Sequence, residues 1–406
     1  MLRMSEQLQG QERQLASLSA KVDALASSLC LVQGQQRAAA AKLGETSGQL
    51  LGEETTNQQA RPQLFAQFKL PESMLAKVLE YLPLSAWVAM DSAMCHRAAR
   101  EHLWLPALKV LNMNGQDYSH EKAFKWMAKK KIRLPPKFVF SRQLSRSILD
   151  QFKLMSTLEL SRVKEVEFEG YHSLHNIKHF NALTSIDMES RHFFNAHDMI
   201  HIQSLTTVRK LNLYNVTLPS SAFSIFESLT SIQDLSLGES GLRDNAIKHF
   251  KHLVQLKTLN IWDCPRLTDV GFSHLGKVTS LQHLELGSEN VTDGGIAQLA
   301  VLSNLRFLSI SNMYNITDNG LAPLCALKKL DTIHLAYLSD TMTGSGLKHL
   351  EKTPLKTVKL LGNFTKGGLE SLHSIKTLQR IEYECEILGE EDFDEYEDKG
   401  IDVKYG

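Results

Sequence analysis

The sequence LKTLNI at residues 256–261 returns as LQHLEL at 281–286, LRFLSI at 305–310 and LDTIHL at 330–335. The four copies start 25, 24 and 25 residues apart. In each copy the first, fourth and sixth residues are apolar, and the last two of these have the spacing of one face of a strand. We interpret each copy as a short strand with one face turned inward.

A helical pattern follows each strand. Thr-Asp-x-Gly, starting at Thr268, Thr292 and Thr317, precedes apolar residues at helical spacing, and Thr and Asp suit the start of a helix. A strand plus a helix every 24–25 residues is typical of leucine-rich repeats. One such unit cannot bury its own apolar side, so neighbouring units are expected to stack into one continuous core.

Ten triplets of this kind lie within residues 141–388, and they begin at Val163, Leu183, Val208, Ile232, Leu256, Leu281, Leu305, Leu330, Leu355 and Leu378. They predict an α/β leucine-rich-repeat solenoid of about ten repeats, with a parallel strand and a helix in each. Residues 111–140 are interpreted as a connecting helix and N-terminal cap, in which 138–140 is a candidate strand. Residues 389–406 are interpreted as a C-terminal cap with a polar helix and an edge strand over 401–405.

Composition excludes several classes of protein. In the 406 residues, 45 Lys and Arg balance 45 Asp and Glu, so the overall charge does not favour nucleic acid or a membrane as partner. Five cysteines without a Cys-x-x-Cys pair disfavour a disulfide framework and a zinc module. No apolar run suits a membrane span or a signal peptide. We expect a soluble protein of the cytoplasm, with the nucleus as an alternative location.

Four Asn-x-Thr sequences are formal N-glycosylation sites, and they start at Asn215, Asn290, Asn315 and Asn363. Each falls where a strand should turn into a helix. Asn tolerates turn geometry there, and Thr caps the helix that follows. We therefore interpret these sequences as turns of the repeat rather than as glycosylation sites.

Residues 1–43 carry apolar positions at alternating steps of three and four, at Leu15, Leu18, Val22, Leu25, Leu29 and Val32. This spacing indicates a short coiled coil through which copies of the chain would associate. The alternative is a single amphipathic helix. Residues 44–63 are rich in Gly, Thr, Gln and Glu, a composition that predicts a flexible linker.

Residues 64–110 predict three short helices. The segment opens with Leu70-Pro71, places apolar pairs at helical spacing and ends in Leu103-Trp104; the pairs are Met74-Leu75, Val78-Leu79 and Met94-Cys95. This order of residues resembles an F-box. The resemblance implies a surface that docks the Skp-type adaptor of a cullin-RING ubiquitin ligase, formed by Leu70, Pro71, Met74, Leu75, Val78, Leu79, Leu82 and Cys95. The alternative is a helical cap over the open edge of the repeat core.

The sequence contains no pattern of a catalytic site. It lacks a Walker-type loop, a His-Glu-x-x-His and a Gly-x-Ser-x-Gly. His172, His175 and His179 share one helical face, but the apolar side of that helix lies opposite, so we interpret them as solvent-facing. We assign no catalytic residue, metal ligand or cofactor, and we expect that the protein is not an enzyme.

Function is expected on the concave face of the sheet, where residues between the inward leucines point outward. The early strands there are acidic. The later ones carry aromatic and polar residues, and exposed aromatic side chains on a rigid scaffold are typical binding anchors. The predicted partner site comprises Tyr214, Asn260, Trp262, Asp263, His283, Phe307, His334 and Tyr337, centred on the four residues Tyr214, Trp262, Phe307 and Tyr337. The alternative for each aromatic ring is that it folds sideways between strands.

Together these features favour a protein-protein interaction module. The F-box resemblance implies the substrate receptor of a cullin-RING ligase, with 64–110 on the adaptor and the concave face on an unknown protein target. The alternative is a leucine-rich-repeat scaffold without any link to ubiquitin, assembled through the coiled coil. We expect no nucleic acid and no membrane among the partners.

Overall fold

The structure is a computed structural model, and it describes residues 110–113, 134, 136–140, 160–168, 174, 177–188, 196–385 and 387–405. The chain divides into two compact units, Met1–Leu108 and Lys109–Gly406. The described residues all belong to the second unit. The predicted coiled coil, linker and F-box-like helices lie outside the described residues, as do His172 and His175.

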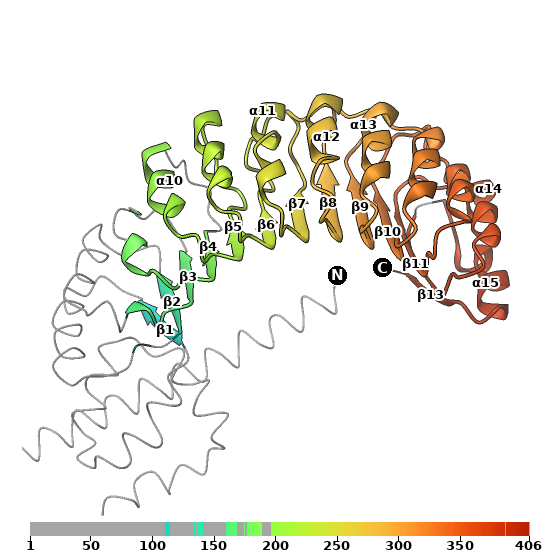
Figure 1. Cartoon of the computed structure of the whole chain (residues 1–406). Helices are drawn as coiled ribbons and strands as arrows, with labels where there is room; N and C mark the ends of the chain where they lie inside the picture. Colours follow the sequence, from blue (N-terminus) through green and yellow to red (C-terminus); the bar gives the residue numbers. More distant parts are fainter. Residues whose placement is uncertain are drawn as a thin grey trace, which may run out of the picture. The chain divides into compact units, whose positions relative to one another are not determined.

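The second unit is built on one sheet of parallel strands that follow one another in chain order (Figure 1). The strands are β1 (Val110–Met113), β2 (Lys137–Phe140), β3 (Glu165–Phe168), β4 (Ser185–Asp187), β5 (Lys210–Asn212), β6 (Asp234–Ser236), β7 (Thr258–Ile261), β8 (His283–Gly287), β9 (Phe307–Ser311), β10 (Thr332–Ala336), β11 (Thr357–Leu361), β12 (Arg380–Glu384) and β13 (Asp402–Tyr405). The ten predicted triplets form β3 to β12, and the two predicted flanking strands form β2 and β13. The sequence did not predict β1.

Register explains why the triplets recur at an almost fixed distance. Leu259 lies opposite Leu284, which lies opposite Leu308, and the row continues through Ile333 and Val358. Every triplet residue from Val163 to Leu378 is buried. The fold is therefore a leucine-rich-repeat solenoid, in which each row of apolar residues runs through all repeats.

The helices lie on the outer side of the curved sheet (Figure 1). They are η3 (Ile177–His179), α10 (Ala196–Gln203), η4 (Ser220–Glu227), α11 (Asp244–Ile247), η5 (Phe250–His252), α12 (Asp269–Leu275), α13 (Asp293–Ala297), η6 (Gln298–Val301), η7 (Asp318–Ala326), η8 (Ser345–Leu350), α14 (Lys366–Glu370), η9 (Ser371–Ser374), η10 (Glu390–Asp392) and α15 (Asp394–Asp398). Those labelled η are 3₁₀ helices. Such helices suit the few residues that each repeat leaves between the cap and the next strand.

The helix starts confirm the capping role of Thr268, Thr292 and Thr317. Each side-chain oxygen accepts a hydrogen bond from a backbone N–H two residues on, at 3.2–3.3 Å. Thr365 caps α14 in a similar way. Of the four Asn-x-Thr sequences, only the first departs from this interpretation: Thr217 does not cap η4, whose cap position is Pro219.

The aspartates that open the helices α11, α12, α13 and η7 have a role that the sequence did not predict: they bind the next repeat. Asp244 accepts hydrogen bonds from the backbone N–H and the hydroxyl of Thr268, at 2.9 and 2.8 Å. The same pair of bonds joins Asp269 to Thr292, Asp293 to Thr317 and Asp318 to Thr343. Thr-Asp-x-Gly is thus a clasp between successive repeats as well as a helix start.

The C-terminal cap is less polar than its composition suggests. Phe393 and Tyr396 are buried, and the Phe393 ring stacks on Tyr383 of the last triplet at 4.0 Å between centroids. The Tyr396 hydroxyl donates to the Leu369 carbonyl. These apolar contacts close the core at its C-terminal end, while the acidic side chains of η10 and α15 remain on the surface.

Candidate functional site

Outward-facing side chains between the buried leucines form the concave face of the sheet. On β7, for example, Leu259 and Ile261 are buried while Thr258 and Asn260 are partly exposed. The same alternation holds on β8 to β11. Predicted partner-site residues on these strands, His283, Phe307 and His334, are accordingly partly exposed.

Two aromatic rings meet across an intervening strand. Tyr214 and Trp262 follow β5 and β7, and their rings stack with centroids 5.5 Å apart at an angle of 28°. Gly238 lies between them, after β6, and a Cβ there would come within 3.0 Å of Tyr214 and 3.1 Å of Trp262. The rings therefore fold sideways over a glycine, and both remain partly exposed. We call this stacked pair the aromatic platform.

An asparagine two residues earlier in the chain fixes the backbone of each platform residue. Asn212 Oδ1 accepts from the Tyr214 backbone N–H at 3.0 Å, and Asn260 Oδ1 accepts from that of Trp262 at 3.2 Å. Each asparagine also donates through Nδ2 to a carboxylate on an adjacent strand. Asn212 donates to Asp187 at 2.9 Å, and Asn260 donates to Glu285 at 2.7 Å.

A second group of rings lies on β8, β9 and β10. His283 stacks on Phe307 with centroids 3.9 Å apart and nearly parallel planes, and Phe307 meets His334 edge-on at 4.6 Å. Glu285 connects this group to the platform, because its carboxylate contacts His283 Nε2 at 2.9 Å as well as Asn260. Six of the eight predicted partner-site residues thus belong to one connected surface: Tyr214, Asn260, Trp262, His283, Phe307 and His334.

Electrostatics favour a neutral His334 in this surface. Burial is the main cause that lowers the pKa of His334, and the nearby Lys359 ammonium lowers it further. A neutral imidazole retains one donor and one acceptor nitrogen. His334 is therefore suited to a hydrogen bond with a partner rather than to an ion pair.

Asp263 and Tyr337 do not lie between leucines, as the sequence suggested, but in the turns just beyond the strands. Both have a left-handed backbone, with φ of 53° and 50°. Asn215, Glu239 and Asn312 share this conformation at the equivalent place in other repeats. A tyrosine is costly in that region, and the Tyr337 side chain is 53% exposed. An exposed ring held in a strained turn has no evident packing role and is a candidate for contact with a partner.

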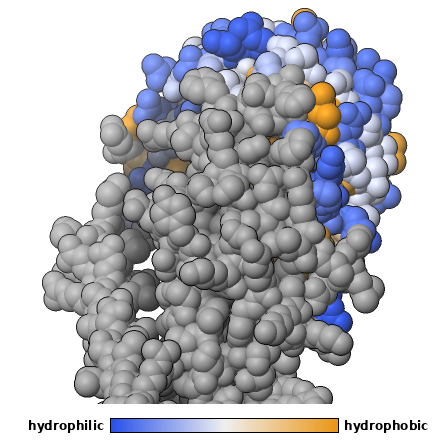
Figure 2. All heavy atoms as spheres, turned by 90° about the vertical axis from the view of Figure 1, so that its left-hand side faces the viewer, coloured by the Kyte–Doolittle hydropathy of each residue, from blue (hydrophilic) through white to orange (hydrophobic). Residues whose placement is uncertain are grey.

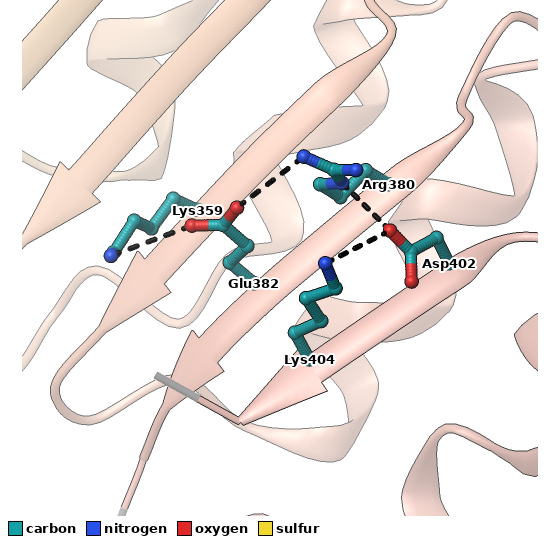
Figure 3. Close-up of polar contacts among 5 residues, drawn as sticks. All are labelled: Lys359, Arg380, Glu382, Asp402 and Lys404. Carbon is teal, nitrogen blue, oxygen red and sulfur yellow. Dashed lines mark hydrogen bonds and ion pairs between the residues drawn. The ribbon is translucent and has the colours of Figure 1, made fainter. Parts of the chain in front are cut away.

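At the C-terminal end of the face, acidic and basic side chains neutralise one another (Figure 3). Glu382 contacts Lys359 at 3.4 Å and Arg380 at 4.0 Å. Asp402 contacts Arg380 at 2.8 Å and Lys404 at 3.6 Å. This alternating network ties β11, β12 and β13 together, and its charges are already matched within the chain.

Cys264, which follows β7, is a free and buried cysteine. Burial raises the pKa of the Cys264 thiol to about 12, so this side chain packs in the core as a neutral thiol. Within the described ranges, no group of three His, Cys, Asp or Glu side chains could hold a metal ion, and no helix there is long and apolar enough to cross a bilayer. Where the described residues are visible in Figure 2, their surface is mainly hydrophilic with scattered apolar side chains.

Comparison with known proteins adds the following. No protein-family model matches the chain, and no curated protein matches it in sequence. Solved structures do match. Internalin C2 from Listeria monocytogenes is 19% identical with a TM-score of 0.39, and the match covers 57% of this chain and 84% of the internalin. A second internalin from the same organism is 16% identical with a TM-score of 0.31, over 64% of this chain and 92% of its own.

Several residues of the surface were not predicted from the sequence: Asn212, Gly238, Glu239 and Glu285. A signal was nevertheless present. LNLYN at 211–215 and LNIWD at 259–263 have the same pattern two repeats apart, with LSLGE between them. Aligning the repeats by their leucines places Tyr214, Gly238 and Trp262 in one row, with the glycine between the rings. The predicted adaptor-binding residues lie outside the described residues.

Proposed function

We propose that this protein is a protein-binding receptor that recognises its partner with the concave face of the repeats. The observation that supports this most is the connected surface from Tyr214 to His334. Aromatic side chains there are partly exposed, and hydrogen bonds and stacking hold them in place. Rigid aromatic anchors lose little conformational entropy on binding, which suits them to the centre of an interface.

We further propose that the receptor serves a cullin-RING ubiquitin ligase. Support comes from the F-box-like order of residues between Leu70 and Trp104, joined in one chain to leucine-rich repeats. In this proposal residues 64–110 bind the Skp-type adaptor, residues 1–43 form a coiled coil and 44–63 a linker. The receptor itself catalyses nothing; it raises the effective concentration of the target near the conjugating enzyme.

Co-purification with the adaptor tests the ligase proposal. We expect the wild-type chain to recover a Skp-type adaptor, and a variant with Leu75→Ser, Val78→Ser and Leu79→Ser to lose at least nine-tenths of it, because the apolar docking surface is gone. Melting of the repeats should be unchanged in the variant. If the folded wild-type chain recovers no adaptor yet still captures a protein target, the alternative of a scaffold without a link to ubiquitin replaces the receptor.

The concave face is tested by proximity labelling of the target. Trp262→Ala with Tyr337→Asn should reduce target labelling by at least tenfold, since two central anchors are removed. Tyr337→Asn leaves the turn intact, because Asn312 adopts the same conformation one repeat earlier. The control is Tyr314→Ala, an exposed tyrosine that follows β9. Equal labelling by the wild type and the double variant would exclude this face as the binding site.

A further inference from the structure

We propose that the aromatic platform binds an arginine side chain, carried by a basic, extended segment of the partner that crosses β4 to β8. This inference rests on the proposed function and adds the chemistry of the partner. It follows from three properties of the platform and its surroundings: the two rings, the oriented carboxylates and the net negative charge.

The rings form a preformed surface for a planar cation. A guanidinium group stacks on tryptophan and tyrosine faces through cation–π attraction. Trp262 and Tyr214 are held by Asn260, Asn212 and their mutual stacking. The Tyr214 hydroxyl is also engaged, by the Glu239 carboxylate. Because the platform is already ordered, binding an arginine costs little additional ordering.

Carboxylates flank the platform in fixed orientations. Glu285 receives Asn260 on one oxygen and faces His283 with the other, at 2.7 and 2.9 Å. Carboxylate oxygens accept several hydrogen bonds each, so these contacts leave acceptor capacity for the forked donors of a guanidinium. Glu239, in the turn after β6, accepts a hydrogen bond from the Tyr214 hydroxyl. The arrangement provides both a stacking face and charged acceptors within one short stretch of the sheet.

Charge separates this region from the rest of the face. Between β4 and β8, five carboxylates face outward or follow the strands: Asp187, Asp234, Glu239, Asp263 and Glu285. Three basic residues, Arg209, Lys210 and Lys257, lie between the inward-facing apolar residues there, so the formal charge of this region is −2. Within the described part of the chain, Asp234, Glu239, Asp263 and Glu285 form no ion pair with a lysine or arginine. At the C-terminal end, by contrast, Glu382 and Asp402 form such pairs (Figure 3). A basic partner segment is therefore favoured at the platform and not at β11 to β13.

The strand spacing sets the length of the segment. Four intervals between β4 and β8 at about 4.8 Å span roughly 19 Å. An extended chain covers about 3.4 Å per residue, so about six residues reach from one acidic end of this region to the other. A seven-residue peptide is consequently a suitable probe.

Selection from a library of random seven-residue peptides on the immobilised full chain tests the proposal. We expect arginine to be enriched at least threefold over the unselected library at low salt. The variant Glu239→Gln with Glu285→Gln should lose this enrichment, while Glu384→Gln, an exposed acid at the end of β12, should keep it. Enrichment of acidic or purely apolar peptides, absence of any enrichment, or the same selection by the double variant would each overturn the proposal.

A pair of peptides matched in shape but not in charge then tests the contact itself. The selected peptide should bind at least tenfold more weakly when its arginine is replaced by citrulline, which keeps the shape and removes the charge, and roughly tenfold more weakly when salt is raised from low to 0.5 M. Equal binding by both peptides overturns the arginine contact. If the double variant has a lowered melting temperature, Asp263→Asn replaces it in the peptide selection, because Asp263 lies in an exposed turn.

The two proposals fail in different ways. Retained capture of the cellular target through Trp262 and Tyr337, without arginine selection, would overturn the arginine contact and leave the receptor function intact. Target capture that does not depend on these residues would overturn the receptor site, whichever peptides are selected.

Discussion

Gly368→Ala should lower the free energy of unfolding by about 3 kcal/mol. Gly368 is buried in α14, and a Cβ there would overlap the carbonyl oxygen of Thr343 and lie 2.7 Å from its carbon. Thr343 belongs to the preceding repeat, and its carbonyl accepts hydrogen bonds from the Thr365 backbone N–H and hydroxyl at 3.1 and 3.3 Å. The extra methyl group must therefore push two repeats apart and weaken both bonds.

The neighbouring glycine is the matched control. Gly367 lies in the same helix, but a Cβ there meets nothing within 4 Å. Gly367→Ala should raise stability by about 0.5–1 kcal/mol, because alanine loses less backbone entropy in a helix. Since repeats interact mainly with their neighbours, hydrogen exchange of the β11 and β12 amides measures both effects locally. Similar changes in protection for the two variants would show that close packing of α14 on Thr343 is not what requires glycine.

The sheet is well predicted because each buried position requires an apolar residue, and these residues recur visibly in the sequence. Leu259, Leu284 and Leu308 recur since each fills the same place in one stacked row. β1 escaped prediction although Leu108, Leu111 and Met113 have the spacing of the triplet. This copy stands apart from the regularly spaced ones, and its place in the sheet is evident only from its pairing with β2. The spacing of apolar residues also cannot distinguish 3₁₀ helices from α helices, because both place apolar residues three to four positions apart.

The candidate binding surface is only partly predictable for a different reason. Residue type and strand alternation placed Tyr214, Trp262 and Phe307 on the concave face. Whether a ring stands alone or lies on its neighbour depends on the residue in the intervening repeat, here Gly238. Likewise, the orientation of Glu285 is set by Asn260 one strand away. Such contacts between repeats can be identified only once the register of the strands is known.

Asp318→Ala should also destabilise the chain by about 3 kcal/mol. The Asp318 carboxylate accepts four hydrogen bonds from the next repeat, from the Thr343 hydroxyl at 2.7 Å and from the backbone N–H groups of Thr343, Gly344 and Gly346 at 3.1, 3.0 and 2.9 Å. Alanine leaves these donors without their charged acceptor. Asp340→Ala is the control, because Asp340 is exposed and accepts one bond, from Asn363 at 3.1 Å; it should cost less than about 0.5 kcal/mol.

The pH dependence of the Asp318→Ala effect distinguishes the carboxylate from a general loss of packing. Burial raises the pKa of Asp318, but the hydrogen bonds from Gly346 and Thr343 outweigh it, so the pKa in the folded chain lies below the ordinary 3.8. The unfolded chain therefore takes up the proton first as the pH falls. The stabilisation is present above pH 3.8 and is lost as the pH falls below it. Denaturant unfolding of wild type and variant should differ most near neutral pH and converge in acid, whereas a difference that does not change with pH would assign the effect to lost packing instead of the charged clasp between repeats.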